Sequence, residues 1–201
     1  MSQITHWLAA GNRVLLVPGW QGSGPNHWQS RWQQRYPDIE RVEQDDWLHP
    51  DVTQWGMRLD ETIRKSSRPI LLVAHSLGCL TVAYWANRYR FSRSRVRAAL
   101  LVAPADSERS QVPWEGQGFA PRRRERLPFP SLLVASDNDY ACTSQVAHTM
   151  AQEWGSAFVL LSSVGHINAD SGLGDWPYGL GLAGDLLARP MPDCRHAQLA
   201  L

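Results

Sequence analysis

Ser76 lies in a short turn between two segments of different character. Residues 71–74 (LLVA) form an apolar run typical of a buried strand, and residues 77–83 (LGCLTVA) favour a helix. The turn at residues 74–78 (AHSLG) follows the pattern Gly-x-Ser-x-Gly, with alanine, the smallest substitute, at the first glycine position. A sharp strand-turn-helix of this kind exposes the serine hydroxyl. The sequence therefore predicts that Ser76 is a nucleophile.

A serine hydroxyl is a weak nucleophile, so it needs a base, and the base needs a carboxylate to orient it. Asp137 and Asp139 follow an apolar run at residues 131–135, and His166 follows another at residues 157–161. The chain order Ser, Asp, His is that of the α/β-hydrolase triad. We expect His166 to act first as general base and then as general acid. Both aspartates are candidates for the third position, and the spacing from the strand end slightly favours Asp139.

Two backbone N–H groups are candidates for an oxyanion hole. The N–H of Leu77 is at the start of the helix that follows the nucleophile, and the N–H of Trp20 is in the loop after the first expected strand. Gly19 permits the close turn that this loop requires. Ten tryptophans are present, and several fall in loops near the expected site. Candidates for the substrate pocket are His27, Trp28 and Trp47, while His75 is expected to point away from Ser76 and to pack.

These residues require an α/β fold. Alternating strands and helices predict a mostly parallel sheet of about six strands with helices on both faces, in which chemistry occurs at the carboxyl ends of the strands. Residues 105–130 are expected to form a long connection with one short helix. We expect a single domain over residues 1–201, with a poorly ordered tail from about residue 190. The expected strands span residues 13–17, 39–42, 69–74, 96–103, 131–135 and 157–161, and the expected helices 26–36, 50–65, 77–89, 144–154 and 178–188.

The composition limits the classes of binding partner that we expect. The chain has 201 residues and a formal net charge of +1, which disfavours nucleic acid or an anionic membrane as a general partner. The charge run at residues 122–126 (RRRER) is expected to be a solvated face. The N-terminus lacks the pattern of a secretory signal, and no stretch is long and apolar enough to span a bilayer, so we expect a cytoplasmic protein. Three scattered cysteines, Cys79, Cys142 and Cys194, indicate reduced thiols and neither a disulfide framework nor a metal site.

Four motifs stand out, at residues 18–29 (PGWQGSGPNHWQ), 74–78 (AHSLG), 135–140 (ASDNDY) and 165–172 (GHINADSG). Together they resemble the small serine hydrolases grouped with YdeN and retinoblastoma-binding protein nine. The resemblance implies a compact, lidless α/β-hydrolase fold, carboxylesterase-type activity and no cofactor. Matched position by position, it implies Ser76 as nucleophile, Asp139 as acid and His166 as base.

The chain departs from this group in two places. Tyr140 stands where bacterial relatives often have proline after the acid, which affects the shape of that loop. The Leu-x-Cys-x-Glu motif linked to retinoblastoma-protein binding is absent, since residues 77–81 (LGCLT) end in threonine, and we do not expect that partner. The expected reaction is hydrolysis of a small ester, an amide or a thioester. The alternatives are a non-catalytic partner-binding protein on the same fold and an acyltransferase with the same triad.

Overall fold

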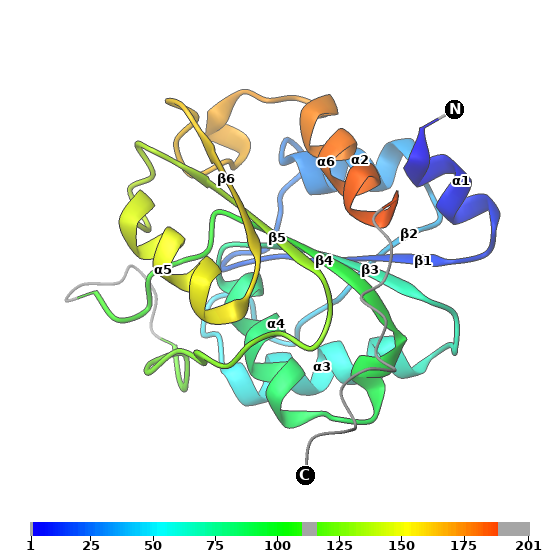
Figure 1. The fold of residues 1–201 in the computed structure, drawn as a ribbon, viewed down its shortest axis with the longest axis horizontal. Helices are drawn as coiled ribbons and strands as arrows, with labels where there is room; N and C mark the ends of the chain where they lie inside the picture. The colour runs from blue at the N-terminus through cyan, green and yellow to red at the C-terminus, as the bar shows by residue number, and fades with distance from the viewer. Residues whose placement is uncertain (1, 110–115, 189–201) are drawn as a thin grey trace, which may run out of the picture.

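The computed structural model describes residues 2–109 and 116–188, and a parallel sheet runs through the middle of this part of the molecule (Figure 1). The order of its six strands is β2-β1-β3-β4-β5-β6. All neighbouring strands are parallel, so their carboxyl ends lie along the same edge of the sheet. The strands are β1 (Arg13–Val17), β2 (Ile39–Arg41), β3 (Ile70–His75), β4 (Val96–Val102), β5 (Ser131–Ser136) and β6 (Ala157–Leu161).

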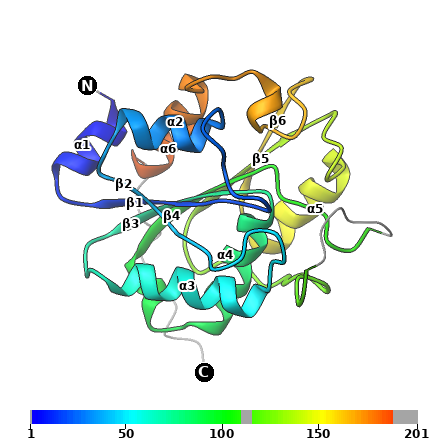
Figure 2. The same cartoon turned by 180° about the vertical axis from the view of Figure 1, so that it is seen from behind.

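Helices cover both faces of this sheet, as Figures 1 and 2 show from opposite sides. Crossovers between parallel strands place helices on the faces of a sheet, which gives an α/β architecture of three layers. One face carries α1 (Gln3–Ala9), α2 (Trp28–Arg35) and α6 (Pro177–Ala188). The other face carries α3 (Val52–Arg64), α4 (Leu77–Arg88) and α5 (Ser144–Trp154).

The central strand β3 is buried on both sides. Leu71 and Val73 belong to the apolar cluster beneath α2 and α6, whereas Leu72 and Ala74 belong to the cluster beneath α3 and α4. All four residues have no exposed surface. A strand that packs against helices on both faces reads as a continuous apolar run instead of an alternating one. The α/β fold expected from the sequence is therefore the fold observed.

Side chains cap the first turns of several helices. α2, expected from residue 26, begins at Trp28 and is capped by His27, and α5 begins at Ser144 and is capped by Thr143. In both cases the capping side chain accepts a hydrogen bond from a backbone N–H group in the first turn. The helix α1, which the sequence pattern did not predict, is capped in the same way by Ser2.

The connection between β4 and β5 was expected to contain one short helix, and the described part of it contains none. The poorly ordered tail expected from about residue 190 lies outside the described residues. None of the helices in the described part of the chain is long and apolar enough to cross a membrane.

The charge run at residues 122–126 is not simply a solvated face. Arg122 is buried, with 8% of its surface exposed, and its guanidinium pairs with the carboxylates of Glu108 and Glu153. Arg124 pairs with the same two carboxylates from the more exposed side. The expectation was wrong at Arg122 because the two glutamates come from distant parts of the chain, which the local sequence does not show.

Gly78 and Gly19 allow two stretches of backbone to approach each other. A Cβ on Gly78 would overlap the carbonyl oxygen of Val17 and lie 2.7 Å from that of Pro18. A Cβ on Gly19 would lie 2.7 Å from the Cβ of Ser76. The loop after β1 can therefore lie directly against the turn between β3 and α4 only because both positions lack a side chain.

We expect the substitution Gly78→Ala to lower the free energy of unfolding by roughly 1–3 kcal/mol or more, because the added methyl group must push the backbone of the loop after β1 away. The matched control is Gly181→Ala in α6, where a Cβ would have open space. This control should raise the stability by up to about 1 kcal/mol through helix propensity. Urea denaturation of the three proteins measures both effects, and equal stability of Gly78→Ala and wild type would contradict the close approach.

Candidate active site

Ser76 occupies a strained turn at the carboxyl end of β3. Its φ of 55° and ψ of −123° lie where residues with a side chain are rarely found. The N–H of Ser76 donates to the carbonyl oxygen of Val102 at 3.0 Å, which ties the turn to the neighbouring strand β4. The hydroxyl does not cap α4, although Ser76 is the residue before the helix. It is therefore available to another partner.

That partner is His166, in the loop after β6. Its Nε2 lies 3.0 Å from the Oγ of Ser76, and its Nδ1 lies 2.9 Å from both carboxylate oxygens of Asp139. The Asp139 side chain is 2% exposed, and the N–H of Ala141 donates to it at 2.7 Å. Because a carboxylate oxygen accepts hydrogen bonds, Nδ1 is the donor to Asp139, and Nε2 is the ring nitrogen that faces the hydroxyl of Ser76.

Asp137 is not in contact with His166. Its carboxylate accepts hydrogen bonds from the hydroxyl of Ser162 at 2.9 Å and from the N–H of Ser163 at 2.8 Å. These bonds, first the one from Ser163, lower the pKa of Asp137 below its ordinary value. The two aspartates that the sequence left open thus have different surroundings, and only Asp139 faces the histidine.

Sequence reasoning missed Asn138, which lies between these aspartates. Its Oδ1 accepts from the N–H of Gly165 at 2.7 Å and from the hydroxyl of Ser136 at 2.8 Å. Together with Asp137, it joins the loop after β5 to the loop after β6. Asp139 and His166 are therefore carried by two loops that are tied directly to each other. The signal was present in the motif at residues 135–140, but its polar residues read as ordinary turn residues.

The two backbone groups proposed for the oxyanion hole flank the serine. Leu77 is the first residue of α4, so its N–H is among those that a helix leaves unpaired at its start. Gly19 packs against this N–H, since a Cβ on Gly19 would lie 3.1 Å from it. Trp20 follows directly and lines the same cavity as Ser76. The oxyanion roles of Trp20 and Leu77 stay predictions.

A cavity of about 490 Å³ opens over Ser76 and His166. Tyr140 stands beside it, with its ring centroid 5.2 Å from that of His166 and its side chain mostly exposed. The hydroxyl of Tyr140 is 3.4 Å from the side-chain amide of Asn168. The lining consists of Trp20, Gln21, Gly22, Gly24, His27, His75, Ser76, Tyr140, Ala141, His166, Asn168, Ala169 and Asp170.

Of the three expected pocket residues, only His27 is in this lining. Trp28 is 1% exposed and donates its indole N–H to the carbonyl oxygen of Ile167 at 2.8 Å, so it supports the His166 loop from inside the protein. Trp47 packs edge-on against Trp55, with centroids 5.5 Å apart. Trp28 is enclosed by neighbours in three dimensions that the sequence does not show, whereas Trp47 is partly buried and lies outside the cavity lining.

Three histidine rings pack in a row that ends at the candidate base, with inclined ring planes. The ring of His75 lies 4.7 Å from that of His27 and 4.9 Å from that of His166. The Nε2 of His75 is 2.9 Å from the backbone oxygen of His166. Burial, assisted by Arg41 and His166, lowers the pKa of His27 from 6.5 to about 3, and burial likewise lowers the pKa of His75. Both rings are therefore neutral around pH 7. His75 is buried and packs between the other two rings, and it also lines the cavity over Ser76.

The described residues offer little support for other chemistry. Within them, no group of three or more histidine, cysteine or carboxylate side chains is arranged to hold a metal ion. Cys79 and Cys142 are free thiols, both buried. Burial raises the pKa of Cys142 to about 12 and raises that of Cys79 as well, so neither is a nucleophile near neutral pH.

The sequence matches the serine hydrolase family over residues 14–184. The chain belongs to this family. No curated protein sequence is detectably similar to the chain as a whole or in part. The family assignment, together with the structural similarities below, confirms the resemblance to the group that includes YdeN.

Solved structures share this fold. A YdeN-like hydrolase from Pectobacterium atrosepticum is 29% identical, with a TM-score of 0.80 over 94% of this chain and 97% of that one. The ydeN gene product of Bacillus subtilis is 19% identical, with a TM-score of 0.67 over 89% of this chain and all of that one. Est1E from Butyrivibrio proteoclasticus is 13% identical, with a TM-score of 0.64 over 89% of each chain. The latter two similarities show the fold alone.

The buried histidines predict a pH-dependent stability. The unfolded chain takes up protons on both residues below pH 6.5, whereas the folded protein does not protonate His27 until about pH 3. The free energy of unfolding should therefore be highest above pH 6.5 and fall as the pH decreases, by up to roughly 1.4 kcal/mol per pH unit for each histidine. Urea denaturation at several pH values between 7.5 and 5 measures this slope.

The variant His27→Gln should have a shallower slope, whatever its stability at pH 7.5, because it removes one of the titrating groups. His6→Gln, at an exposed position, is the matched control and should keep the slope of the wild type. An unchanged slope in His27→Gln would show that His27 does not titrate as its burial implies.

Proposed function

We propose that this serine hydrolase cleaves a small ester through an acyl-enzyme on Ser76, with His166 as general base and acid and Asp139 as the carboxylate that orients it. The observation that carries the proposal is the hydrogen-bonded chain from Ser76 through His166 to Asp139 at the carboxyl edge of the sheet, inside a cavity. Ser, His and Asp in this geometry form the arrangement used in acyl transfer.

In the first step, the Oγ of Ser76 attacks the ester carbonyl carbon while its proton passes to the Nε2 of His166. The carboxylate of Asp139 stabilises the imidazolium that forms. The carbonyl oxygen becomes an oxyanion, for which the N–H groups of Leu77 and Trp20 are the proposed donors. When the bond between the acyl carbon and the alkoxide oxygen breaks, His166 returns the proton to the leaving alcohol. The acyl group stays on Ser76.

In the second step, water attacks the acyl-enzyme. His166 accepts a proton from the water, a second oxyanion forms in the same place, and Ser76 leaves as its alcohol with the proton returned by His166. The products are a carboxylic acid and the free enzyme. An amide or a thioester would follow the same steps with an amine or a thiol as leaving group.

The cavity supports a small substrate. Its volume of about 490 Å³ is within the usual range of small-molecule sites, and the aromatic rings of Trp20 and Tyr140 offer apolar contacts beside polar side chains. The proposal includes a cytoplasmic location, for which the free thiols of Cys79 and Cys142 are the support, because reduced cysteines are usual there.

The proposal predicts covalent labelling by a fluorophosphonate probe, measured by intact mass. Wild type should gain one adduct, and Ser76→Ala should gain none. Labelling by Asp139→Asn should be slower by roughly 10³- to 10⁴-fold, because the asparagine favours the wrong tautomer of His166. Asp137→Asn is the matched comparison two residues away. Asp137 does not contact the histidine, and asparagine keeps an oxygen that can accept from the N–H of Ser163, so this variant should label far faster than Asp139→Asn.

Absence of labelling in folded wild type would contradict the proposal and favour a partner-binding role. If Asp137→Asn were slow and Asp139→Asn normal, the carboxylate would be assigned wrongly. Hydrolysis of p-nitrophenyl esters of increasing acyl length then measures the substrate range. Product analysis with added alcohols or amines distinguishes hydrolysis from acyl transfer.

A further inference from the structure

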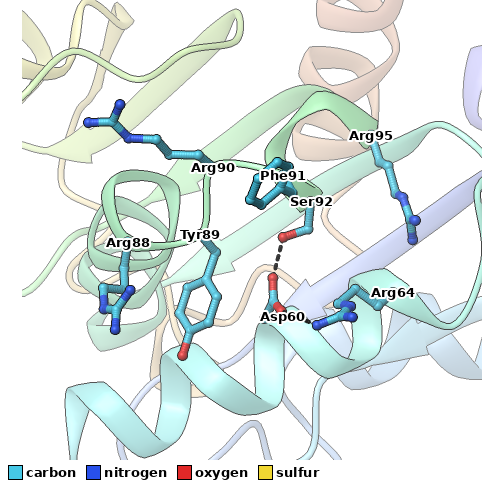
Figure 3. A pocket seen from close by; sticks show the side chains of 8 residues that line it. All are labelled: Asp60, Arg64, Arg88, Tyr89, Arg90, Phe91, Ser92 and Arg95. Atoms are coloured by element: carbon cyan, nitrogen blue, oxygen red, sulfur yellow. Dashed lines mark hydrogen bonds and ion pairs between the residues drawn. The ribbon is translucent and has the colours of Figure 1, made fainter.

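A second cavity, of about 640 Å³, lies at the other end of the sheet, between the carboxyl-terminal parts of α3 and α4 and the turn that leads into β4 (Figure 3). It shares no lining residue with the cavity over Ser76. Arg95 in its wall directly precedes Val96, the first residue of β4, so the cavity is at the amino edge of the sheet. The lining consists of Asp60, Arg64, Arg88, Tyr89, Arg90, Phe91, Ser92 and Arg95.

Four arginines and one carboxylate line this cavity, and that carboxylate is already engaged. Asp60 is buried and accepts hydrogen bonds from the indole N–H of Trp85 at 3.0 Å and from the hydroxyl of Ser92. Arg64, one turn further along α3, is 3.7 Å from it. In Figure 3, the pair of Asp60 and Ser92 lies between the arginines. Asp60 therefore balances one positive charge at most.

The other three guanidinium groups have no carboxylate partner among the described residues. Arg95 donates to the carbonyl oxygens of Ser66 at 3.0 Å and Ile63 at 3.4 Å, which fixes its position without neutralising it. Arg88 lies over the ring of Tyr89, 5.8 Å from its centroid. Arg90 has no ion pair within the described part of the chain. Because the chain as a whole has a net charge of only +1, this excess is local, and it favours an anion.

The cavity also offers an aromatic ring to a ligand. Phe91 is 98% exposed, the most exposed of the large apolar side chains among the described residues. It stands between Arg90 and Ser92, within the lining. An exposed ring beside guanidinium groups suits a ligand that combines a planar ring with an anionic group, because the ring can stack and the anion can accept paired N–H donors.

We propose that this cavity binds a small phosphorylated ligand that carries an aromatic ring, of the nucleoside-phosphate class. Guanidinium groups match phosphate geometry through paired hydrogen bonds, and the volume is typical of a small-molecule site. The concave shape favours a compact ligand over a long polyanion. The site is separate from the proposed catalytic centre and does not depend on it.

Isothermal titration calorimetry with ADP tests this proposal on the full chain at low salt. Wild type should bind one ADP, and the arginine variants that follow show whether it binds in this cavity, because none of those arginines lines the cavity over Ser76. Arg88→Gln and Arg90→Gln should each weaken binding by about tenfold, because each removes a charge-assisted hydrogen bond. Arg68→Gln, an exposed arginine outside the cavity, is the matched control and should bind as wild type does.

The contribution of the Phe91 ring to ADP binding is tested separately, with the variant Phe91→Ala. Because Phe91 is exposed, this substitution should leave the fold intact, and it should weaken the affinity for ADP by about three- to tenfold. Pyrophosphate has no ring and should bind the variant and wild type with equal affinity. No binding of ADP at millimolar concentration would overturn the proposal. Equal ADP affinity of Arg88→Gln, Arg90→Gln and wild type would also overturn it. The same holds if an oligonucleotide displaces ADP and binds far more tightly.

Discussion

The candidate site depends on one strained residue that is held by backbone packing. Ser76 adopts a positive φ because the chain must reverse between β3 and α4 within a single residue. The loop after β1 presses against this turn through Gly19 and Gly78, and any side chain at either position would separate them. The strain at Ser76 is thus maintained by tight contacts on both sides, which keep its hydroxyl pointing outward.

A second constraint fixes the partners of the serine. Asp139 and His166 come from different loops, and such loops would be free to move apart if only their side chains met. The bonds from Asp137 to Ser163 and from Asn138 to Gly165 join the two loops by their backbones. Beside His166, the ring of His75 donates its Nε2–H to the backbone carbonyl oxygen of His166. The distances at the site are therefore set by a framework of neighbouring bonds as well as by the three side chains.

The sequence predicted the fold and the order of the site residues for a physical reason. Parallel strands buried on both faces read as apolar runs, and the polar residues after them must gather at one edge of the sheet, so Ser76 and His166 could be placed from their positions. Position alone left both Asp137 and Asp139 as candidates for the carboxylate. What the sequence could not show is which way a side chain turns. Trp28 was expected at the pocket and instead packs beneath the Ile167 backbone, because this depends on elements far away in the chain.

The same limit explains why the arginine-lined cavity is invisible in the sequence. Its members come from the end of α3, the end of α4 and the turn before β4, and each arginine alone resembles an ordinary exposed charge. Only the fold shows that Asp60 already accepts hydrogen bonds from Trp85 and Ser92. Among the described residues, Arg88, Arg90 and Arg95 therefore have no carboxylate to balance their charge. Charges of one sign that are gathered in a hollow repel each other, which destabilises the folded state unless an anion offsets them. A positively charged hollow with an exposed ring thus has an energetic reason to bind a ligand, at the edge of the sheet opposite Ser76.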